Sequence, residues 1–259
     1  MARGARLAVQ RLDTRALVCG RHPLGEADLI VRLFTEEGGM VSVVARGARR
    51  ASRRFASLEP MHSLTVRVEL PSVRELGNLV EASVDRPRLG IMASLATLDA
   101  AGHALRWVRD AAAPRAREPM MWRELNELLD ALDGIPAVLE RGVGGATSLL
   151  VAFGMRLLVL GGWALELDRC VRCGKPCPTD ARVVVHIAAG GVVCRACDGS
   201  AATSGASPQR HVVLRGEERR WLVACACGEE FPTAGPRAFD VGLALIDEAL
   251  RLHSRGDAT

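Results

Sequence analysis

Two Cys-x-x-Cys pairs are the part of this 259-residue chain whose residue types and spacing point most clearly to chemistry. Cys170 and Cys173 form the first pair, and Cys194 and Cys197 form the second, which follows Gly190-Gly191. The twenty residues between the pairs can form a hairpin that brings the four thiolates together. Four thiolates complete the tetrahedral coordination of zinc and leave no position for an activated water. The pattern therefore predicts a structural zinc module, with Zn²⁺ as its cofactor.

The same cysteines allow two other interpretations. A redox Cys-x-x-Cys pair would open a helix after a strand, and it would not explain a second pair at the same spacing. A disulfide framework would require an oxidising compartment.

Three further thiols and one histidine leave the ligand assignment open. Cys177, Cys225 or Cys227 could replace one of the four ligands, and Cys177 lies close to Cys173 in the sequence. His186 lies between the two pairs and could also be a ligand, although a solvated strand position is favoured there.

A second feature is the segment 46–55, which contains five arginines and no acidic residue. Guanidinium groups match the geometry of phosphate oxygens, so the segment is a candidate nucleic-acid contact, with an ordinary solvated loop as the alternative. Its aromatic residue could stack on a base or anchor the loop. The candidate binding residues are Arg46, Arg49, Arg50, Arg53, Arg54 and Phe55.

Aromatic residues that could stack on bases are scarce. The region before residue 86 contains only Phe34 and Phe55, and the chain has no tyrosine. We therefore expect binding to be mainly electrostatic. If all five arginines contact phosphates, the logarithmic salt slope on single strands should be roughly −3.5.

Short strands should position the basic segment. Alternating apolar residues and turn signals between residues 15 and 85 predict five strands, with a long insert between the third and fourth. This arrangement is typical of a small barrel, and the OB-fold is the favoured candidate. The predicted strands are Arg15–Arg21, Ala27–Thr35, Met40–Ala45, 64–69 and Leu76–Val84.

Helical periodicity begins after Pro87 and continues on both sides of the cysteine pairs. The predicted helices are Leu89–Asp110, Met120–Leu132, a helix that Pro136 opens, Thr147–Leu160, Gly216–Ala226 and Arg237–His253. We therefore predict a multidomain α+β protein in which a zinc module is inserted into a helical domain. The predicted domains are an OB-fold nucleic-acid-binding domain (1–85), the first part of an α-helical domain (86–168), the four-cysteine zinc module (169–200) and the C-terminal part of the helical domain (201–259).

Composition and apolar runs indicate a soluble protein. Hydrophobic residues make up 49% of the chain and charged residues 25%, which excludes disorder throughout. The N-terminus lacks the apolar core of a secretory signal, and the stretch Leu149–Leu160 is too short to span a bilayer. We expect a cytoplasmic protein with reduced thiols and no membrane partner.

Several segments along the chain carry a family resemblance. In the barrel region they are Gly25 to Val31, Phe34 to Gly39, Ala45 to Arg50, Ser52 to Phe55 and Leu58 to Pro60. Those farther along are Phe153 to Leu158, Gly161-Gly162, Leu167 to Gly174 and Gly190 to Cys194. Together these segments resemble the bacterial RecO family of recombination mediators. The resemblance covers about residues 8 to 200 and is lost after Ser200, so the role of the C-terminal region stays open.

The resemblance implies a non-enzymatic, nucleoid-associated protein that acts in recombinational repair. Such a protein binds single- and double-stranded DNA, anneals complementary strands, and works with RecR and single-strand-binding protein (SSB) to load RecA on SSB-coated DNA. It implies DNA contact by the five loop arginines and zinc ligation by the four cysteines. An acidic C-terminal SSB tail would need an arginine beside an apolar pocket. The candidates are Arg106, Trp107 and Arg109, or Trp122 with Arg123.

Two rival functions come from other classes. A zinc-ribbon transcription regulator would read duplex DNA with a helix, but no convincing helix-turn-helix is present. A hydrolase would need an open metal site or a nucleophile with its base. The chain has no His-Glu-x-x-His, Walker or Gly-x-Ser-x-Gly motif, and its six histidines are scattered.

Overall fold

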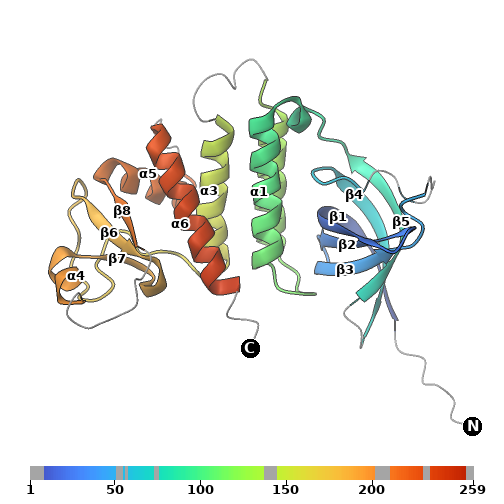
Figure 1. Cartoon of the computed structure of the whole chain (residues 1–259), viewed down its shortest axis with the longest axis horizontal. Helices are drawn as coiled ribbons and strands as arrows, with labels where there is room; N and C mark the ends of the chain where they lie inside the picture. The colour runs from blue at the N-terminus through green and yellow to red at the C-terminus, as the bar shows by residue number, and fades with distance from the viewer. Residues whose placement is uncertain are drawn as a thin grey trace, which may run out of the picture. The chain divides into compact units, whose positions relative to one another are not determined.

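The computed structural model describes residues 9–50, 55, 58–72, 76–136, 145–201, 211–229 and 234–254 (Figure 1). The chain divides into two compact units, Met1–Gly134 and Ile135–Thr259. This division falls inside the region predicted as the first part of a helical domain, and the four predicted domain ranges remain a prediction. The two units are described separately.

The first unit contains a closed five-stranded barrel with the strand order β1-β2-β3-β5-β4. Strands β3 and β5 pair in parallel, and the other pairs are antiparallel. Five strands closed in this way form the predicted OB-fold. The strands are β1 (Val9–Leu24), β2 (Asp28–Thr35), β3 (Gly39–Ala45), β4 (Ser63–Pro71) and β5 (Leu76–Arg86).

Alternation along the strands places one row of side chains inside the barrel. Val31 and Leu33 of β2 and Val41 and Val43 of β3 are buried in this core. Strand β1 is longer than predicted because its first half pairs with β4, while its second half pairs with β2. A bulge after Val18 bends the strand between these two partners.

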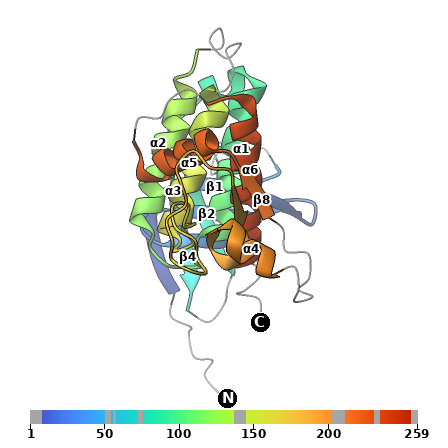
Figure 2. The same cartoon turned by 90° about the vertical axis from the view of Figure 1, so that its left-hand side faces the viewer.

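Two helices of the same unit, both labelled in Figure 2, pack against each other, and the first also packs against strands β1 and β2. They are α1 (Leu95–Ala111) and α2 (Pro119–Asp133), and a short 3₁₀ helix, η1 (Gly90–Ala93), precedes α1. The Ser94 side chain caps α1 by accepting a hydrogen bond from the Thr97 N–H. Phe34 projects outward from β2 and packs on Trp122 of α2, with ring centroids 5.8 Å apart.

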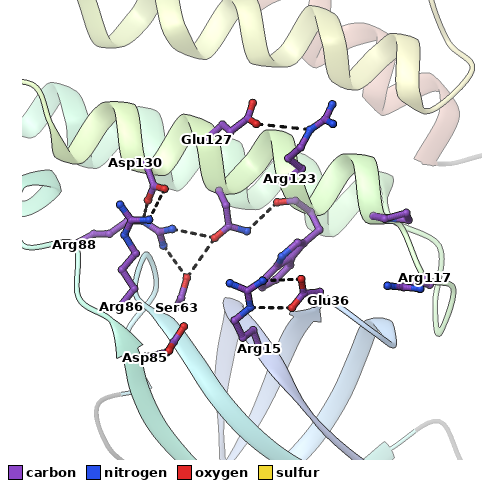
Figure 3. A pocket seen from close by; sticks show the side chains of 13 residues that line it. Arg15, Glu36, Ser63, Asp85, Arg86, Arg88, Arg117, Arg123, Glu127 and Asp130 are labelled. Carbon is purple, nitrogen blue, oxygen red and sulfur yellow. Dashed lines mark hydrogen bonds and ion pairs between the residues drawn. The ribbon is translucent and has the colours of Figure 1, made fainter.

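One buried guanidinium joins the barrel to α2 (Figure 3). The Arg88 side chain is only 1% exposed. Its Nε donates to Asp130 Oδ1 at 2.7 Å, and its Nη2 donates to Asn126 Oδ1 at 2.9 Å. Its Nη1 donates to the Met61 carbonyl at 2.9 Å and to Ser63 Oγ at 3.1 Å. Arg88 therefore fixes the start of β4 and the segment after β5 to the same helix.

The second unit has a helical part built from α3 (Gly145–Leu160), α5 (Gly216–Cys227) and α6 (Pro236–Ser254). Helix α3 packs against both of the others. A Cβ added at Gly242 of α6 would lie 2.7 Å from Val151 Cγ1, so this glycine permits the close approach of α6 to α3. These helices were predicted. The helix expected to begin at Pro136 falls on residues 137–144, which lie outside the described residues.

The remainder of the second unit is a small α/β module that carries the cysteine pairs. Its three-stranded sheet has the order β7-β6-β8, and β6 and β7 form the predicted hairpin. Strand β8 and helix α4 were not predicted. The elements are β6 (Val183–His186), the 3₁₀ helix η3 (Ile187–Ala189), β7 (Gly191–Val193), α4 (Arg195–Ala201) and β8 (His211–Leu214).

A mixed α+β architecture with an N-terminal barrel, helical regions and a four-cysteine module is thereby confirmed. None of the helices in the described ranges is long and apolar enough to cross a membrane.

Replacing Arg88 with methionine should lower the free energy of unfolding by about 3 kcal/mol, because the substitution leaves Asp130 and Asn126 without their buried donor. Urea denaturation followed by circular dichroism measures this loss. The control is Arg86→Met, which removes a 57% exposed partner of the same Asp130. It should cost less than about 1 kcal/mol. Equal effects of the two substitutions would contradict the role assigned to Arg88.

Candidate functional site

The four cysteines of the two Cys-x-x-Cys pairs meet in space. Their sulfur atoms all lie within 4.8 Å of one another, and the Sγ atoms of Cys173 and Cys194 are 3.8 Å apart. A tetrahedral thiolate site with metal–sulfur distances of about 2.3 Å has an edge of about 3.8 Å. The donor set and its spacing therefore fit one metal ion held by Cys170, Cys173, Cys194 and Cys197.

Backbone hydrogen bonds shape the turn that carries the first pair. The Cys170 N–H donates to the Lys175 carbonyl at 2.9 Å, and the Gly174 N–H donates to the Cys170 carbonyl at 2.8 Å. The second pair differs, because Cys194 follows β7 directly and Cys197 lies in the first turn of α4.

Gly191 allows the segment before the first pair to approach the hairpin. The Glu166 N–H donates to the Gly190 carbonyl at 2.9 Å, and the Val192 N–H donates to the Glu166 carbonyl at 2.8 Å. A Cβ on Gly191 would lie 2.2 Å from the Glu166 carbonyl oxygen, so any larger residue would force the Glu166 segment away from β7. The Val171 N–H then donates to the Val192 carbonyl at 2.9 Å, which brings the two pairs together.

The backbone also favours ionisation of Cys170. Burial raises the pKa of this thiol, but the N–H groups of Cys194, Cys173 and Arg172 outweigh burial and lower the pKa to about 6. The Cys194 N–H donates to Cys170 Sγ at 3.3 Å. Hydrogen bonds with the Cys194 and Cys173 thiols raise the pKa of Cys197 to about 12. Cys170 therefore presents a thiolate at neutral pH, which is the form that binds a metal.

The other cysteines lie outside the group of four. All eight cysteines fall within the described residues, and none forms a disulfide. Burial raises the pKa of Cys19 and of Cys225 to about 12, which makes both thiols inert. Burial, followed by repulsion from Cys170, raises the pKa of Cys177, so this thiol lies near the cluster without joining it.

The second pair has the local setting of a redox pair, because it follows a strand and opens a helix. Its three-dimensional neighbours argue for a metal site instead. Cys194 Sγ lies 3.8 Å from Cys173 Sγ of the other pair, and all four sulfur atoms share one small volume.

His186 ends strand β6, as predicted, but the expectation that it is solvated is wrong. Helix α4 carries Asp198 to the ring, and His186 Nε2 lies 2.8 Å from Asp198 Oδ1. His211 of β8 is the cross-strand partner of His186, and the two rings stack with centroids 6.0 Å apart. His186 therefore tethers α4 to the sheet and is not one of the clustered ligands.

The basic segment begins directly after β3. Arg46, Arg49 and Arg50 are exposed, whereas Arg53 and Arg54 lie outside the described residues. The turn is tied to the β1–β2 connection. The Arg49 N–H donates to the Ala27 carbonyl at 3.0 Å, and Arg49 Nη1 donates to the Gly25 carbonyl at 2.8 Å.

Phe55 follows the arginines and packs toward the barrel interior. It is half-buried against the barrel core and forms an isolated bridge with Ala82 of β5. Of the two roles considered for this ring, the packing favours an anchor for the basic loop over a stacking platform.

One outer face of the barrel, which we call the paired face, carries arginines that are neutralised by acids. Arg11 Nε lies 3.1 Å from Glu69 Oε1. Arg67 Nε lies 2.8 Å from Asp13 Oδ1, and its Nη1 lies 3.4 Å from Glu81 Oε2. Internal ion pairs of this kind leave little net positive charge for a polyanion.

Several arginines that line a cavity of about 340 Å³ between the barrel and α2 are likewise paired with acids (Figure 3). Arg15 donates two hydrogen bonds to Glu36, at 2.8 and 2.7 Å, and this contact lowers the pKa of Glu36. Arg86 and Arg88 share Asp130, with distances of 2.7 Å each. The cavity is therefore a polar joint within the unit.

The tryptophan of each candidate site for an acidic tail is buried and cannot contact a peptide at the surface. Trp107 is 1% exposed and Trp122 is 6% exposed, because both rings pack inside the unit. An apolar pocket for such a tail would have to come from other side chains.

Comparison with known proteins identifies similar chains along most of the sequence. Residues 9–88 match the family model "Recombination protein O N terminal", and residues 92–215 match "Recombination protein O C terminal". The "DNA repair protein RecO" of Anaeromyxobacter sp. (strain Fw109-5) is 36% identical over 195 residues, which cover 74% of this chain and 73% of that protein. The "DNA repair protein RecO" of Rubrobacter xylanophilus is 32% identical over 185 residues, 71% of this chain and 70% of that protein.

The Cys197→Ser variant should lose its bound metal, because three thiolates and a hydroxyl hold the ion much more weakly. The matched control is Cys177→Ser, which should retain about one ion per chain because Cys177 lies outside the cluster. Elemental analysis of freshly purified, reduced protein measures both. Metal retained in the Cys197 variant, or lost in the Cys177 variant, would require a different ligand set.

Proposed function

This chain belongs to the RecO family of recombination proteins, and we propose that it is a non-enzymatic mediator that binds single- and double-stranded DNA and anneals complementary strands. In this role it would act with RecR and with the C-terminal tail of SSB to load RecA on SSB-coated DNA during recombinational repair. Family membership and the exposed arginines of the turn after β3 support the proposal.

The observation that carries the DNA-binding proposal is the contrast between the basic turn and the paired face. Arg46 and Arg50 are exposed, and in the described part of the chain their side chains have no partner. On the paired face, Arg11 and Arg67 already contact carboxylates. Unpaired cations on a braced turn can contact successive phosphates and release condensed counterions.

Annealing follows from the same charge. Two DNA strands repel each other through their phosphates, and a cationic turn that contacts both strands lowers this repulsion. Because the barrel region offers few aromatic rings, the bases stay available for pairing. The protein would thus neutralise charge without holding the bases.

We assign zinc to the four-cysteine site because a closed set of four thiolates suits Zn²⁺ better than harder cations. Cys170, Cys173, Cys194 and Cys197 would hold it. When bound, the ion cross-links the first turn to the β6–β7 hairpin and to α4. This contribution would stabilise the module.

Replacing the exposed arginines of the basic turn should weaken DNA binding and should also make the affinity less dependent on salt concentration. The Arg46→Gln/Arg50→Gln double variant should reduce the magnitude of the salt slope on single-stranded DNA by about 1.4, at about 0.7 per lost phosphate contact. It should also slow annealing. Arg49 is left unchanged because it braces the turn.

The matched control is Arg11→Gln/Arg67→Gln, which removes the same formal charge from the paired face. This control should keep the salt slope of the original protein, because the two arginines that it replaces are already paired with acids. Fluorescence anisotropy at several salt concentrations gives both slopes. Equal slopes for the two double variants would place DNA elsewhere on the protein.

Phe55→Leu should bind DNA with an affinity within about twofold of the original protein, because leucine can still fill the core position of an anchor. A stacking platform would lose its aromatic contact, so the same substitution would weaken binding by about fivefold or more. Anisotropy with a single-stranded oligonucleotide distinguishes the two outcomes.

A further inference from the structure

We propose that Arg219 of α5 supports the metal site, because its buried guanidinium balances part of the negative charge that four thiolates keep when they hold a divalent ion. This inference rests on the zinc assignment in the proposed function and deepens it. It also gives a role to the C-terminal region, since α5 begins at Gly216, directly after the residues that match the family models.

Arg219 is buried without an acidic partner, unlike the buried Arg88, which contacts Asp130. Arg219 is only 1% exposed, and its Nη2 donates to the carbonyls of Cys177 and Pro178 at 3.1 and 2.9 Å. Its Nη1 has no hydrogen-bond partner, and no carboxylate within the described ranges forms an ion pair with it. A guanidinium removed from water needs a countercharge, because desolvation of a cation is costly.

The acids nearest to Arg219 are occupied by other arginines. Arg220, the next residue of α5, pairs with Asp180. Arg237 of α6 pairs with Glu218, the buried carboxylate that precedes Arg219 in the sequence. The countercharge of Arg219 must therefore come from a different group.

Helix α5 approaches the cysteine module closely enough to place the Arg219 side chain there. A Cβ added at Gly216 would lie 2.5 Å from Asp180 Cα and 2.7 Å from the Thr179 carbonyl oxygen. Gly216 thus allows the first turn of α5 to lie against the segment that follows Cys177. Arg219 lies about one turn farther along the helix and reaches the two carbonyls just before that segment.

Backbone pairing connects these carbonyls to the first pair of cysteines. The Cys170 N–H donates to the Lys175 carbonyl at 2.9 Å, and the Cys177 N–H donates to the Asp168 carbonyl at 2.8 Å. The residues that Arg219 contacts are therefore paired with the residues that lead into the Cys170 turn. A guanidinium held at this place lies next to the cluster without being one of its ligands.

The Cys177 thiol lies within electrostatic reach of both the guanidinium and the cluster. Burial raises the pKa of this thiol, negative charge at Cys170 raises the pKa further, and the Arg219 guanidinium lowers it. Cys194 and Cys173 of the cluster also raise this pKa. These opposite effects on one sulfur atom show that the guanidinium and the cluster share one small region of the module.

The charge of the loaded site supplies the missing partner. Four thiolates and one Zn²⁺ keep a net charge of about −2. Backbone N–H groups, such as that of Cys194 on Cys170 Sγ at 3.3 Å, offset part of this charge. The Arg219 guanidinium offsets more of it, because a protein interior screens charges weakly. Loss of such an outer partner typically weakens metal binding by about tenfold to a hundredfold.

The test compares two replacements of Arg219 that separate charge from hydrogen bonding. Arg219→Lys keeps a positive charge, whereas Arg219→Gln keeps a side-chain donor for the carbonyls without the charge. The affinity for Zn²⁺ is measured in reduced, full-length protein by competition with a chromogenic chelator. Arg219→Gln should bind zinc about tenfold or more weakly than the original protein, and Arg219→Lys should recover most of this loss.

Arg220→Gln is the matched control, because it removes the same charge from the next residue of the same helix. The Arg220 side chain is 50% exposed and already paired with Asp180. The zinc affinity of this variant should therefore stay within about twofold of that of the original protein. Circular dichroism of the zinc-loaded proteins checks that the variants keep their helices.

Equal zinc affinities of the two Arg219 variants, whether high or low, would overturn the charge assigned to Arg219. An equal loss of affinity in the Arg220 variant would overturn it as well. In both cases zinc bound by the original protein would leave the zinc assignment intact. An original protein that binds no zinc would instead remove that assignment, and this inference with it.

Discussion

Closure of the barrel through the parallel pairing of β3 with β5 is the constraint on which the surface of the first unit depends. Once the strands close, each must turn one row of side chains inward and the other outward. The inward rows are aliphatic and form the core. One outward face carries arginines that are paired with acids. In the turn after β3, Arg46 and Arg50 are exposed, and their side chains have no partner within the described ranges. The proposed DNA contact follows from this separation, because net charge and not the number of arginines attracts a polyanion.

Each unit also relies on one polar centre that holds elements distant in sequence. In the first unit, the buried Arg88 connects Met61 and Ser63 at the start of β4 with Asp130 of α2. Met61 adopts a positive φ of 81° at this point, a conformation that costs about 1–2 kcal/mol for a residue with a side chain. In the second unit, the four cysteines connect the turn at Cys170 with the hairpin and α4. Both centres depend on complete sets of partners, so a single substitution should weaken the whole unit.

Much of the fold and the metal cluster could be predicted from local patterns. The alternation of apolar and polar residues predicted strands β2 to β5 closely. The spacing of the two cysteine pairs was sufficient to predict that the four thiols lie together. The first half of β1 was not predicted, because Arg11 and Asp13 are charged residues whose partners on β4 are remote in sequence. The burial of His186 depends on its contact with Asp198 of α4, and the burial of Trp122 depends on its packing against Phe34. Both contacts join residues of different elements, so no local pattern predicts them.

The central claim is that phosphates, rather than bases, account for nearly all of the DNA-binding energy. The most direct measurement compares the affinity for an oligothymidine with that for an abasic strand of equal length and charge, at the same salt concentrations. The account predicts affinities within a few-fold of each other and equal salt slopes, because both strands present the same phosphates. A loss of affinity of a hundredfold or more on the abasic strand, on the order of what two or more stacked bases contribute, would contradict it.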